Sequence, residues 1–348
     1  MGQQGFWDVA AREEKLKQKK DILNQLNQLV PWETFRPILR RIHEKPRKSN
    51  AGRKSTDVLR LFKMLVLQKL YNISDEELEY QVNDRLSFMQ FLGLGIEDTV
   101  PDATTVWLFR EQLHQHSLVE ELFEQFGQYL QGAGYAAKDG QIVDATLIPV
   151  PKQRNTREEN QTLKQGEVPV EWPSKPHKFA QKDVDARWTK KHGMSYYGYK
   201  NHVSSDVSFK FIRRYTVTDA SVHDSQVLGE LLDADNCGDG LWADSAYLSG
   251  LIVDVLKLMG FEPHINERAY RNRPLSEAQK AANRERSKTR ARVEHVFGDF
   301  VTSMGGKAVR SIGLARAQTQ LGLKNLVYNL KRFVSLETQP AASAELTG

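Results

Sequence analysis

The chain has 348 residues, about the length of two domains, with 40% hydrophobic residues and a formal net charge of +5. Its single cysteine, Cys237, excludes a disulfide framework and a cysteine-rich zinc site, and it fits a reducing compartment such as a cytoplasm. No apolar run approaches the roughly 18 residues that a membrane span needs. We therefore expect neither a secreted nor a membrane protein.

Charge is unevenly distributed along the chain. Residues 1–60 carry a net +7, residues 150–192 a net +4 and residues 271–310 a net +6, whereas the rest is acidic. Separated basic blocks of this kind indicate a polyanion partner. For each block taken singly, solvated charge without a partner is the alternative.

The first 135 residues are predicted to be helical. Apolar residues recur at helical spacing over residues 16–30, 58–65, 78–86, 106–113 and 118–130. Ser74 with Glu77 predicts a helix start, and Pro101-Asp102 predicts another. A basic loop at residues 43–54 contains Arg53 and Lys54, two candidate DNA contacts. Short helices beside this loop allow a helix-turn-helix DNA reader, although the periodicity alone favours a plain helical packing domain.

The pattern changes after Gly134. Strands are predicted at residues 141–150, 198–204, 210–218 and 240–244, and helices at 227–232, 251–259, 283–300 and around 323–333. Three sequential strands followed by alternation with helices predict a mixed sheet flanked by helices. Residues 152–192 are polar and basic and are interpreted as a loop or a partly ordered insertion, and residues 336–348 as a disordered tail.

Most acids of the chain lie in predicted helices or loops, where exposure to solvent accounts for them. Three acids do not fit that pattern. Asp144 interrupts an apolar strand, Asp244 directly follows the apolar segment Leu241-Trp242-Ala243, and Glu294 borders the apolar stripe of a basic helix. A buried, unpaired carboxylate is unfavourable, so the first two need a compensating partner. Each acid also has an ordinary explanation: a strand-end turn for Asp144, a cap for Asp244 and a helical ion pair with Arg290 for Glu294.

Carboxylates from two strands and one helix could meet at one edge of the sheet. Like charges at short range oppose ionisation unless cations neutralise them. Mg²⁺ suits such a cluster because it binds through a few carboxylates together with substrate phosphates, and a pair of metal ions can support phosphoryl transfer. One hypothesis from the sequence is therefore a metal-dependent phosphoryl-transfer site formed by Asp144, Asp244 and Glu294. Its basic surroundings would hold nucleic acid.

Over residues 50 to 335 the chain resembles a DDE transposase of the IS4/IS5 insertion-sequence type, closest to the IS5 family. The segments that carry the resemblance are SDEELEYQVNDR from Ser74, the acid-bearing IVDATLIPVP, YKNH from Tyr199, VTDASVHDS from Val217, LWADSAY, RARVEHVFG from Arg290 and KNLVYNL from Lys324. In them Asp144, Asp244 and Glu294 match the three catalytic acids of the family. Two positions depart from the IS4-type signature: Ser287 stands in place of its Tyr and Val301 in place of its Lys, for which Lys307 or Lys288 could substitute.

The resemblance implies an α/β fold with an RNase H-like mixed-sheet core over residues 136–335, preceded by an all-α DNA-binding and assembly domain over residues 1–135. It also implies Mg²⁺-dependent cleavage at insertion-sequence ends and strand transfer into target DNA, with Mn²⁺ as a possible substitute. The three acids would hold the metal. Residues expected to contact DNA in or near this core are Lys152, Arg154, Lys200, His202, Arg290 and Arg292. For His202 a structural role is the favoured alternative, and for Arg292 the alternative is a side chain that faces solvent.

The implied partners are double-stranded DNA with terminal inverted repeats and target DNA, bound by a homodimer or higher oligomer in the cytoplasm of a bacterium. Two alternatives remain open at this point. One is a nuclease on the same core that cuts without joining, and the other is a non-catalytic DNA-binding protein derived from a transposase. Asp219 and Asp224 compete with Asp244 as the second acid, although their segment is typical of a strand-to-helix turn.

Overall fold

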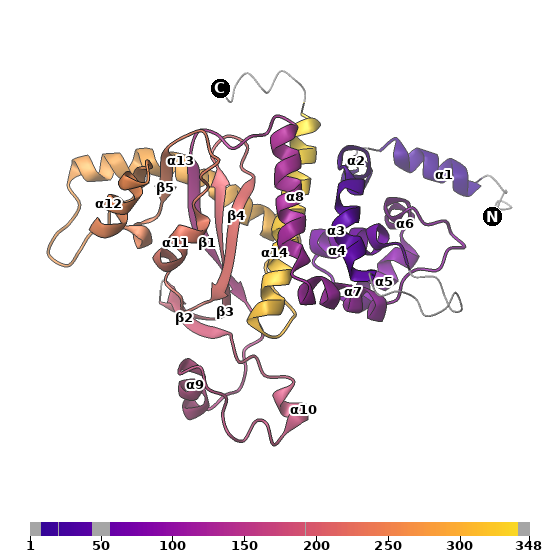
Figure 1. Ribbon diagram of the computed structural model, residues 1–348, viewed down its shortest axis with the longest axis horizontal. Coiled ribbons are helices and arrows are strands. Elements are labelled where there is room, and N and C mark those ends of the chain that lie inside the picture. The colour runs from indigo at the N-terminus through magenta and orange to yellow at the C-terminus, as the bar shows by residue number, and fades with distance from the viewer. Residues whose placement is uncertain (1–7, 20, 44–55, 192, 340–348) are drawn as a thin grey trace. The chain divides into compact units, whose positions relative to one another are not determined.

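The computed structural model describes residues 8–19, 21–43, 56–191 and 193–339, and the chain divides into two compact units (Figure 1). The helical unit comprises residues 1–126, 303–305 and 323–348. The sheet unit comprises residues 127–302 and 306–322. The predicted basic loop with Arg53 and Lys54 lies outside the described residues.

Short helices form the helical unit. They are α1 (Asp8–Lys17), α2 (Ile22–Leu29), η1 (Trp32–Phe35), α3 (Arg36–Arg40), η2 (Arg41–His43), α4 (Val58–Tyr71), α5 (Asp75–Asp84), α6 (Leu86–Leu92), α7 (Ala103–Gln115) and most of α8 (Leu118–Gly132). The predicted starts are found where expected. Ser74 accepts a hydrogen bond from the Glu77 amide at the start of α5, and Asp102 accepts one from the Thr105 amide at the start of α7. These side chains satisfy backbone donors that the first turn of a helix leaves free.

The core of the helical unit is aromatic and contains one buried ion pair. Phe35, Phe62 and Phe126 are fully buried side chains, and Phe35 packs tilted against both of the others. Arg110 of α7 donates from both terminal nitrogens to the carboxylate of Asp75 in α5, at 2.7 Å each. This two-point pairing fixes the angle between the two helices, because the planar guanidinium matches the carboxylate in one orientation.

The sheet unit is built on six strands. They are β1 (Gln141–Pro149), β2 (Arg187–Lys191), β3 (Met194–Asp206), β4 (Ile212–Asp219), β5 (Gly240–Ala243) and β6 (Glu262–Ile265). Its helices are α9 (Arg157–Lys164), α10 (Pro176–Phe179), η3 (Asp224–Val227), α11 (Leu228–Leu231), η4 (Ser245–Tyr247), α12 (Gly250–Leu258), α13 (Glu277–Thr302) and the first part of α14 (Leu314–Glu337).

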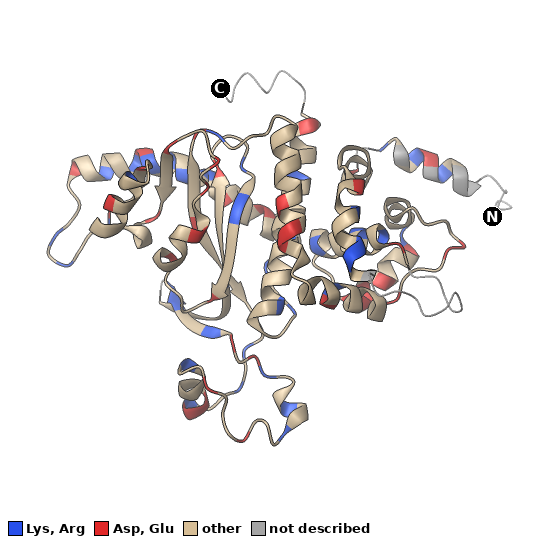
Figure 2. Ribbon diagram, in the orientation of Figure 1, with Lys and Arg blue, Asp and Glu red and all other residues tan. Residues whose placement is uncertain are grey.

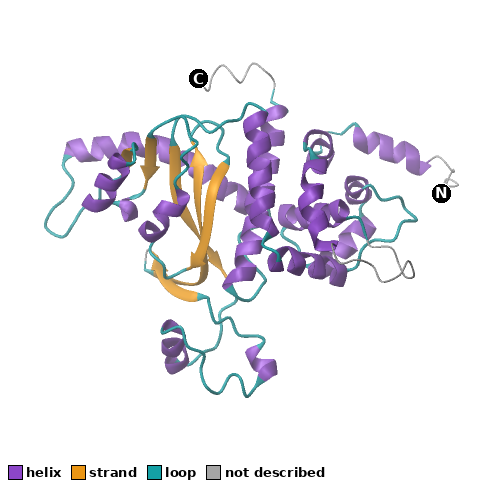
Figure 3. Cartoon of the chain, viewed as in Figure 1, coloured by secondary structure: helices purple, strands orange, loops and turns teal. Residues whose placement is uncertain are grey.

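The sheet is mixed, as predicted (Figure 3). β3 pairs antiparallel with β1 on one side and with β4 on the other, and it also forms a hairpin with β2. β5 pairs parallel with β1, and β6 pairs parallel with β5. α13 is held against this sheet unit by Val293, Val296 and Phe300, which are fully buried. This arrangement confirms the predicted α/β class, with a mixed sheet preceded in the chain by a helical region.

Several elements of the sheet unit were not predicted. The insertion at residues 152–192 contains α9, α10 and β2, and the short strand β6 follows α12. β2 and β6 were missed because their sequences, RWTKK and EPHI, lack the apolar alternation of a half-buried strand. α13 begins at Glu277 rather than near Asn283, because Ser276 and Gln279 exchange side-chain to backbone hydrogen bonds at its start.

The closing helix α14 is divided between the units, with its residues from 323 onwards grouped with the helical unit rather than with the sheet. It runs to Glu337, so the first two residues of the predicted tail are helical, and residues 340–348 lie outside the described part. No described helix is both long and apolar enough to cross a bilayer.

Candidate active site

Two of the predicted acids lie side by side where β5 ends against β1. The last pair of the parallel ladder joins Val143 of β1 to Ala243 of β5. Asp144 and Asp244 are the next residues on the two strands, and neighbouring strands are only about 4.8 Å apart. Asp244 then caps η4 by accepting a hydrogen bond from the Ala246 amide at 2.8 Å. The fold therefore places two carboxylates, 100 positions apart in the sequence, at the same point of the sheet.

The environment of the half-buried Asp144 opposes its ionisation. Burial, together with the negative charge of Asp244, raises the pKa of Asp144 from 3.8 to about 6. The Ala145 amide, which donates to Oδ1 at 2.8 Å, and the positive charges of Arg290 and Lys191 lower it in part. The ionised form of such a carboxylate is stabilised by a nearby cation, and the surrounding side chains provide only part of that stabilisation.

The third predicted acid approaches from α13 by way of an arginine. Arg290 places Nη1 3.3 Å from Oδ2 of Asp144 and Nη2 3.8 Å from Oε1 of Glu294, one helical turn further on. The side chain of Glu294 is 65% exposed, whereas that of Asp144 is 16% exposed. Arg290 thus links the first and third acids instead of leaving their carboxylates in direct contact.

Two lysines add positive charge beside Asp144. Lys307 donates from Nζ to Oγ1 of Thr146 at 2.6 Å, and Thr146 lies two residues beyond Asp144 on the same face of β1. Burial and the positive charge of Lys191 lower the pKa of Lys307, while the charge of Asp144 raises it. The sequence indicates Lys307 as a substitute for a missing signature lysine and as part of the C-terminal basic block, but it does not single out Lys191.

The acids provide some, but not all, of the ligands that a divalent cation needs. The hydroxyl of Tyr247 is buried and has no hydrogen-bond partner among the residues that the structure describes, and the pKa of this group is raised by burial and by the charges of Asp224, Asp144 and Asp244. This orphaned hydroxyl and the adjacent aspartates form a polar, negatively charged niche. Among the described residues, however, no three His, Cys, Asp or Glu side chains are grouped closely enough to hold a metal ion. Asp144 and Asp244 could supply two ligands, and Glu294 would have to displace its contact with Arg290 to join them.

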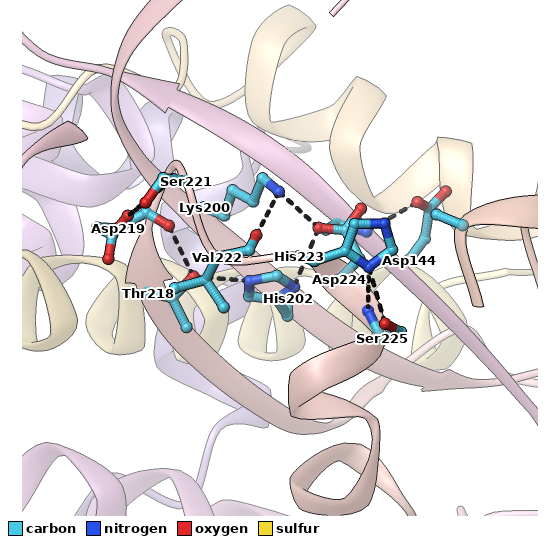
Figure 4. Close-up of polar contacts among 12 residues, drawn as sticks. Asp144, Lys200, His202, Thr218, Asp219, Ser221, Val222, His223, Asp224 and Ser225 are labelled. Atoms are coloured by element: carbon cyan, nitrogen blue, oxygen red, sulfur yellow. Dashed lines mark hydrogen bonds and ion pairs between the residues drawn. The ribbon is translucent and has the colours of Figure 1, made fainter. Parts of the chain in front are cut away.

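A second polar network joins β3, the end of β4 and the segment after β4 (Figure 4). Lys200 donates to the Val222 carbonyl at 2.7 Å and to Oδ1 of Asp224 at 2.8 Å. His202 forms a 2.9 Å hydrogen bond with Thr218. Lys200 is therefore occupied within the protein, in contrast to its predicted role as a phosphate contact.

His202 is a correction to the predicted DNA-contact set. Its side chain is fully buried on β3, between β1 and β4, so it presents no surface to DNA. Burial lowers its pKa to about 4, which leaves the ring neutral near pH 7 and without attraction for phosphate. The sequence could not reveal this, because strand alternation does not say which face of a central strand is covered.

The remaining predicted contacts are more exposed. Lys152 is exposed and lies 5.8 Å above the ring of Trp188, and Arg154 is also exposed. Arg292 is exposed but donates to the Val207 carbonyl at 2.9 Å. The basic residues of α13 form a series along the helix, seen as blue segments in Figure 2. The acids are thus surrounded by positive charge from several parts of the sheet unit.

The chain matches two transposase families. The Transposase DDE domain matches residues 135–330, more than half of the chain, and a second transposase domain, DUF772, matches residues 11–112. The chain belongs to the DDE transposase family. It is accordingly an enzyme that cleaves and joins DNA. Among solved structures, the piggyBac transposase synaptic complex with hairpin DNA is similar at 11% identity and a TM-score of 0.48, over 95% of this chain and 77% of that one.

The raised pKa of Asp144 predicts a pH-dependent stability cost in this transposase. The folded chain holds the Asp144 proton up to about pH 6, whereas the unfolded chain releases it near pH 3.8, so this cost grows as pH rises between the two values. At 1.36 kcal/mol per pKa unit it reaches at most about 3 kcal/mol above pH 6. D144N should therefore unfold at a higher temperature than the wild type at pH 7.5 in EDTA, and the difference should shrink at pH 4.5.

The control for this measurement is D254N, which removes an exposed carboxylate from α12. It should shift the unfolding temperature little at either pH. An equal shift for D144N at both pH values would contradict the argument.

Proposed function

We propose that the chain is an insertion-sequence transposase of the IS5 type that cleaves the ends of its element and joins them to target DNA. The proposal assigns catalysis to Asp144, Asp244 and Glu294, with Mg²⁺ as the cofactor and Mn²⁺ as a substitute. The observation that supports it most is the half-buried Asp144 beside Asp244, with α13 carrying Arg290 and Glu294 next to them. Two adjacent carboxylates in a positively charged site suit a reaction on phosphodiesters.

In this proposal Asp144 and Asp244 hold the metal, and Glu294 completes the set from α13. Bound there, the metal would activate the attacking oxygen and stabilise the leaving oxygen of the phosphodiester. Lys307, with Nζ held near Asp144 by Thr146, is suited to contact a phosphate oxygen of the scissile strand. Arg290 is suited to release Glu294 and bind phosphate, because a guanidinium pairs with phosphate as well as with carboxylate.

The proposed partners are duplex DNA with terminal inverted repeats and a target duplex, bound by two or more copies of the chain in a bacterial cytoplasm. Lys152, Arg154 and Arg292 would contact the DNA backbone near the site. Because such contacts are mainly electrostatic, binding should weaken steeply as salt is raised.

The test is incubation of the purified chain with Mg²⁺ and duplex DNA taken from both flanks of its reading frame, with EDTA as the control. We expect metal-dependent nicks at the repeat ends and products joined to a second duplex, resolved on denaturing gels. Nicks without joined products would instead support the nuclease alternative. Salt-sensitive binding without any metal-dependent nick would support a non-catalytic DNA-binding protein.

A further inference from the structure

Helix α9, in the insertion between β1 and β2, presents a continuous polar face. Arg157, Asn160, Gln161 and Lys164 are spaced i, i+3, i+4 and i+7, which places them on one side of the helix. With Asn155 and Gln165, these residues line an open pocket of about 700 Å³. α9 and α10 extend beyond the end of the sheet near β2 (Figure 1). The face is thus well placed for a large partner.

The opposite side of α9 is anchored in a small core of its own. Leu163 and Trp172 are 4% and 1% exposed, and the Trp172 indole donates to Glu159 at 2.8 Å. Thr156 and Glu159 form a capping box at the start of the helix. Arg187 donates to the Leu163 carbonyl at 2.6 Å near its end. A helix of eight residues is marginal alone, so these contacts are what hold it in one orientation.

Three side chains on the polar face are not used inside the protein. Arg157, Gln161 and Lys164 form no hydrogen bond or ion pair with any described part of the chain, whereas Asn160 donates to the Thr156 carbonyl at 2.9 Å. A structural role for the lobe requires Trp172 and Leu163 but none of these three. Their free donors point to a partner outside the chain.

The chemistry of this face fits the major groove of duplex DNA. The surrounding block, residues 150–192, carries a net +4, and basic residues recur along the lobe in Figure 2. Arg and Lys pair with guanine edges and Gln with adenine edges in the major groove. An α-helix with its side chains is about 10–12 Å in diameter, which fits the roughly 12 Å width of that groove.

We propose that α9 is a DNA-reading helix, which enters the major groove of the duplex and contacts base edges through Arg157, Gln161 and Lys164. The inference rests on the proposed function in taking DNA as the partner. It adds a recognition element within the catalytic part of the chain, separate from the helical region at the N-terminus.

The test selects bound duplexes from a pool of random-sequence DNA, in EDTA, using the full-length wild type and the double variant Q161A/K164A. The wild type should enrich a preferred sequence, and the variant should lose preference at two or three adjacent base pairs. Affinity for the duplex selected by the wild type should fall about tenfold or more.

The matched control is K257A, which removes an exposed lysine from α12 and should leave the selected sequence unchanged. Near-ultraviolet circular dichroism should show that both variants keep the wild-type fold. An unchanged base preference in Q161A/K164A would overturn the proposal, even if affinity fell, because the helix would then contact only the backbone.

Failure of this inference and failure of the proposed function can be told apart. The selection measures binding without metal, whereas the cleavage assay needs Mg²⁺. Q161A/K164A should still nick its DNA at saturating concentration, because neither residue lies at the acids. Nicking with no effect of α9 on base preference overturns only the reading helix, and an α9-dependent preference without nicking overturns only the catalytic proposal.

Discussion

D144N should lose nicking activity by about a thousandfold or more while still binding DNA. The change keeps the size of the side chain but removes the negative charge that lies beside Asp244. Metal-assisted stabilisation of a phosphoryl-transfer transition state amounts to several kcal/mol, and each 1.36 kcal/mol is a factor of ten in rate. The measurement is the single-turnover rate of the first nick with Mg²⁺ at saturating DNA.

The stability of D144N separates a catalytic role from a structural one. Because burial and Asp244 oppose the charge of Asp144, D144N should be at least as stable as the wild type near neutral pH. Active sites often combine an unfavourable charge with function, so a more stable and inactive variant is the expected pattern. D254N, on the exposed surface of α12, should keep wild-type activity. A D144N protein that nicks within threefold of the wild type would remove Asp144 from the mechanism.

E294Q should reduce the nicking rate by about a hundredfold or more with almost no effect on stability. The Glu294 side chain is 65% exposed, and its ion pair with Arg290 spans 3.8 Å, so its loss should change the free energy of unfolding by less than about 0.5 kcal/mol. A large loss of rate would then reflect the reaction and not the fold. Single-turnover nicking and thermal unfolding measure the two effects.

E285Q is the matched control for this variant. Glu285 lies on the same helix, is 71% exposed and forms an ion pair with Lys288, so the two substitutions differ mainly in position. E285Q should nick at the wild-type rate. Equal rates for E294Q and E285Q would show that the third acid does not take part, in keeping with a site made by the two aspartates alone.

Elements with a strong local pattern were predictable. β1 was recognised from the β-branched run around Asp144, and α5 from Ser74 with Glu77, because apolar periodicity and caps depend on neighbouring residues. β2 and α9 were not recognised. β2 is held in place by pairing with β3, and α9 by packing around Trp172. Both are contacts that form only as the chain folds.

The sequence by itself identified the acids and the basic blocks, because a carboxylate inside an apolar strand and a run of cations are visible in the residue order. Only the tertiary structure decided which of them meet. The end of β5 against β1 places Asp244 beside Asp144, and α13 brings Arg290 between Asp144 and Glu294. The tertiary structure also buries His202 and engages Lys200 in a hydrogen bond with Asp224. Strand pairing and burial depend on residues far apart in the chain, and no local pattern encodes them.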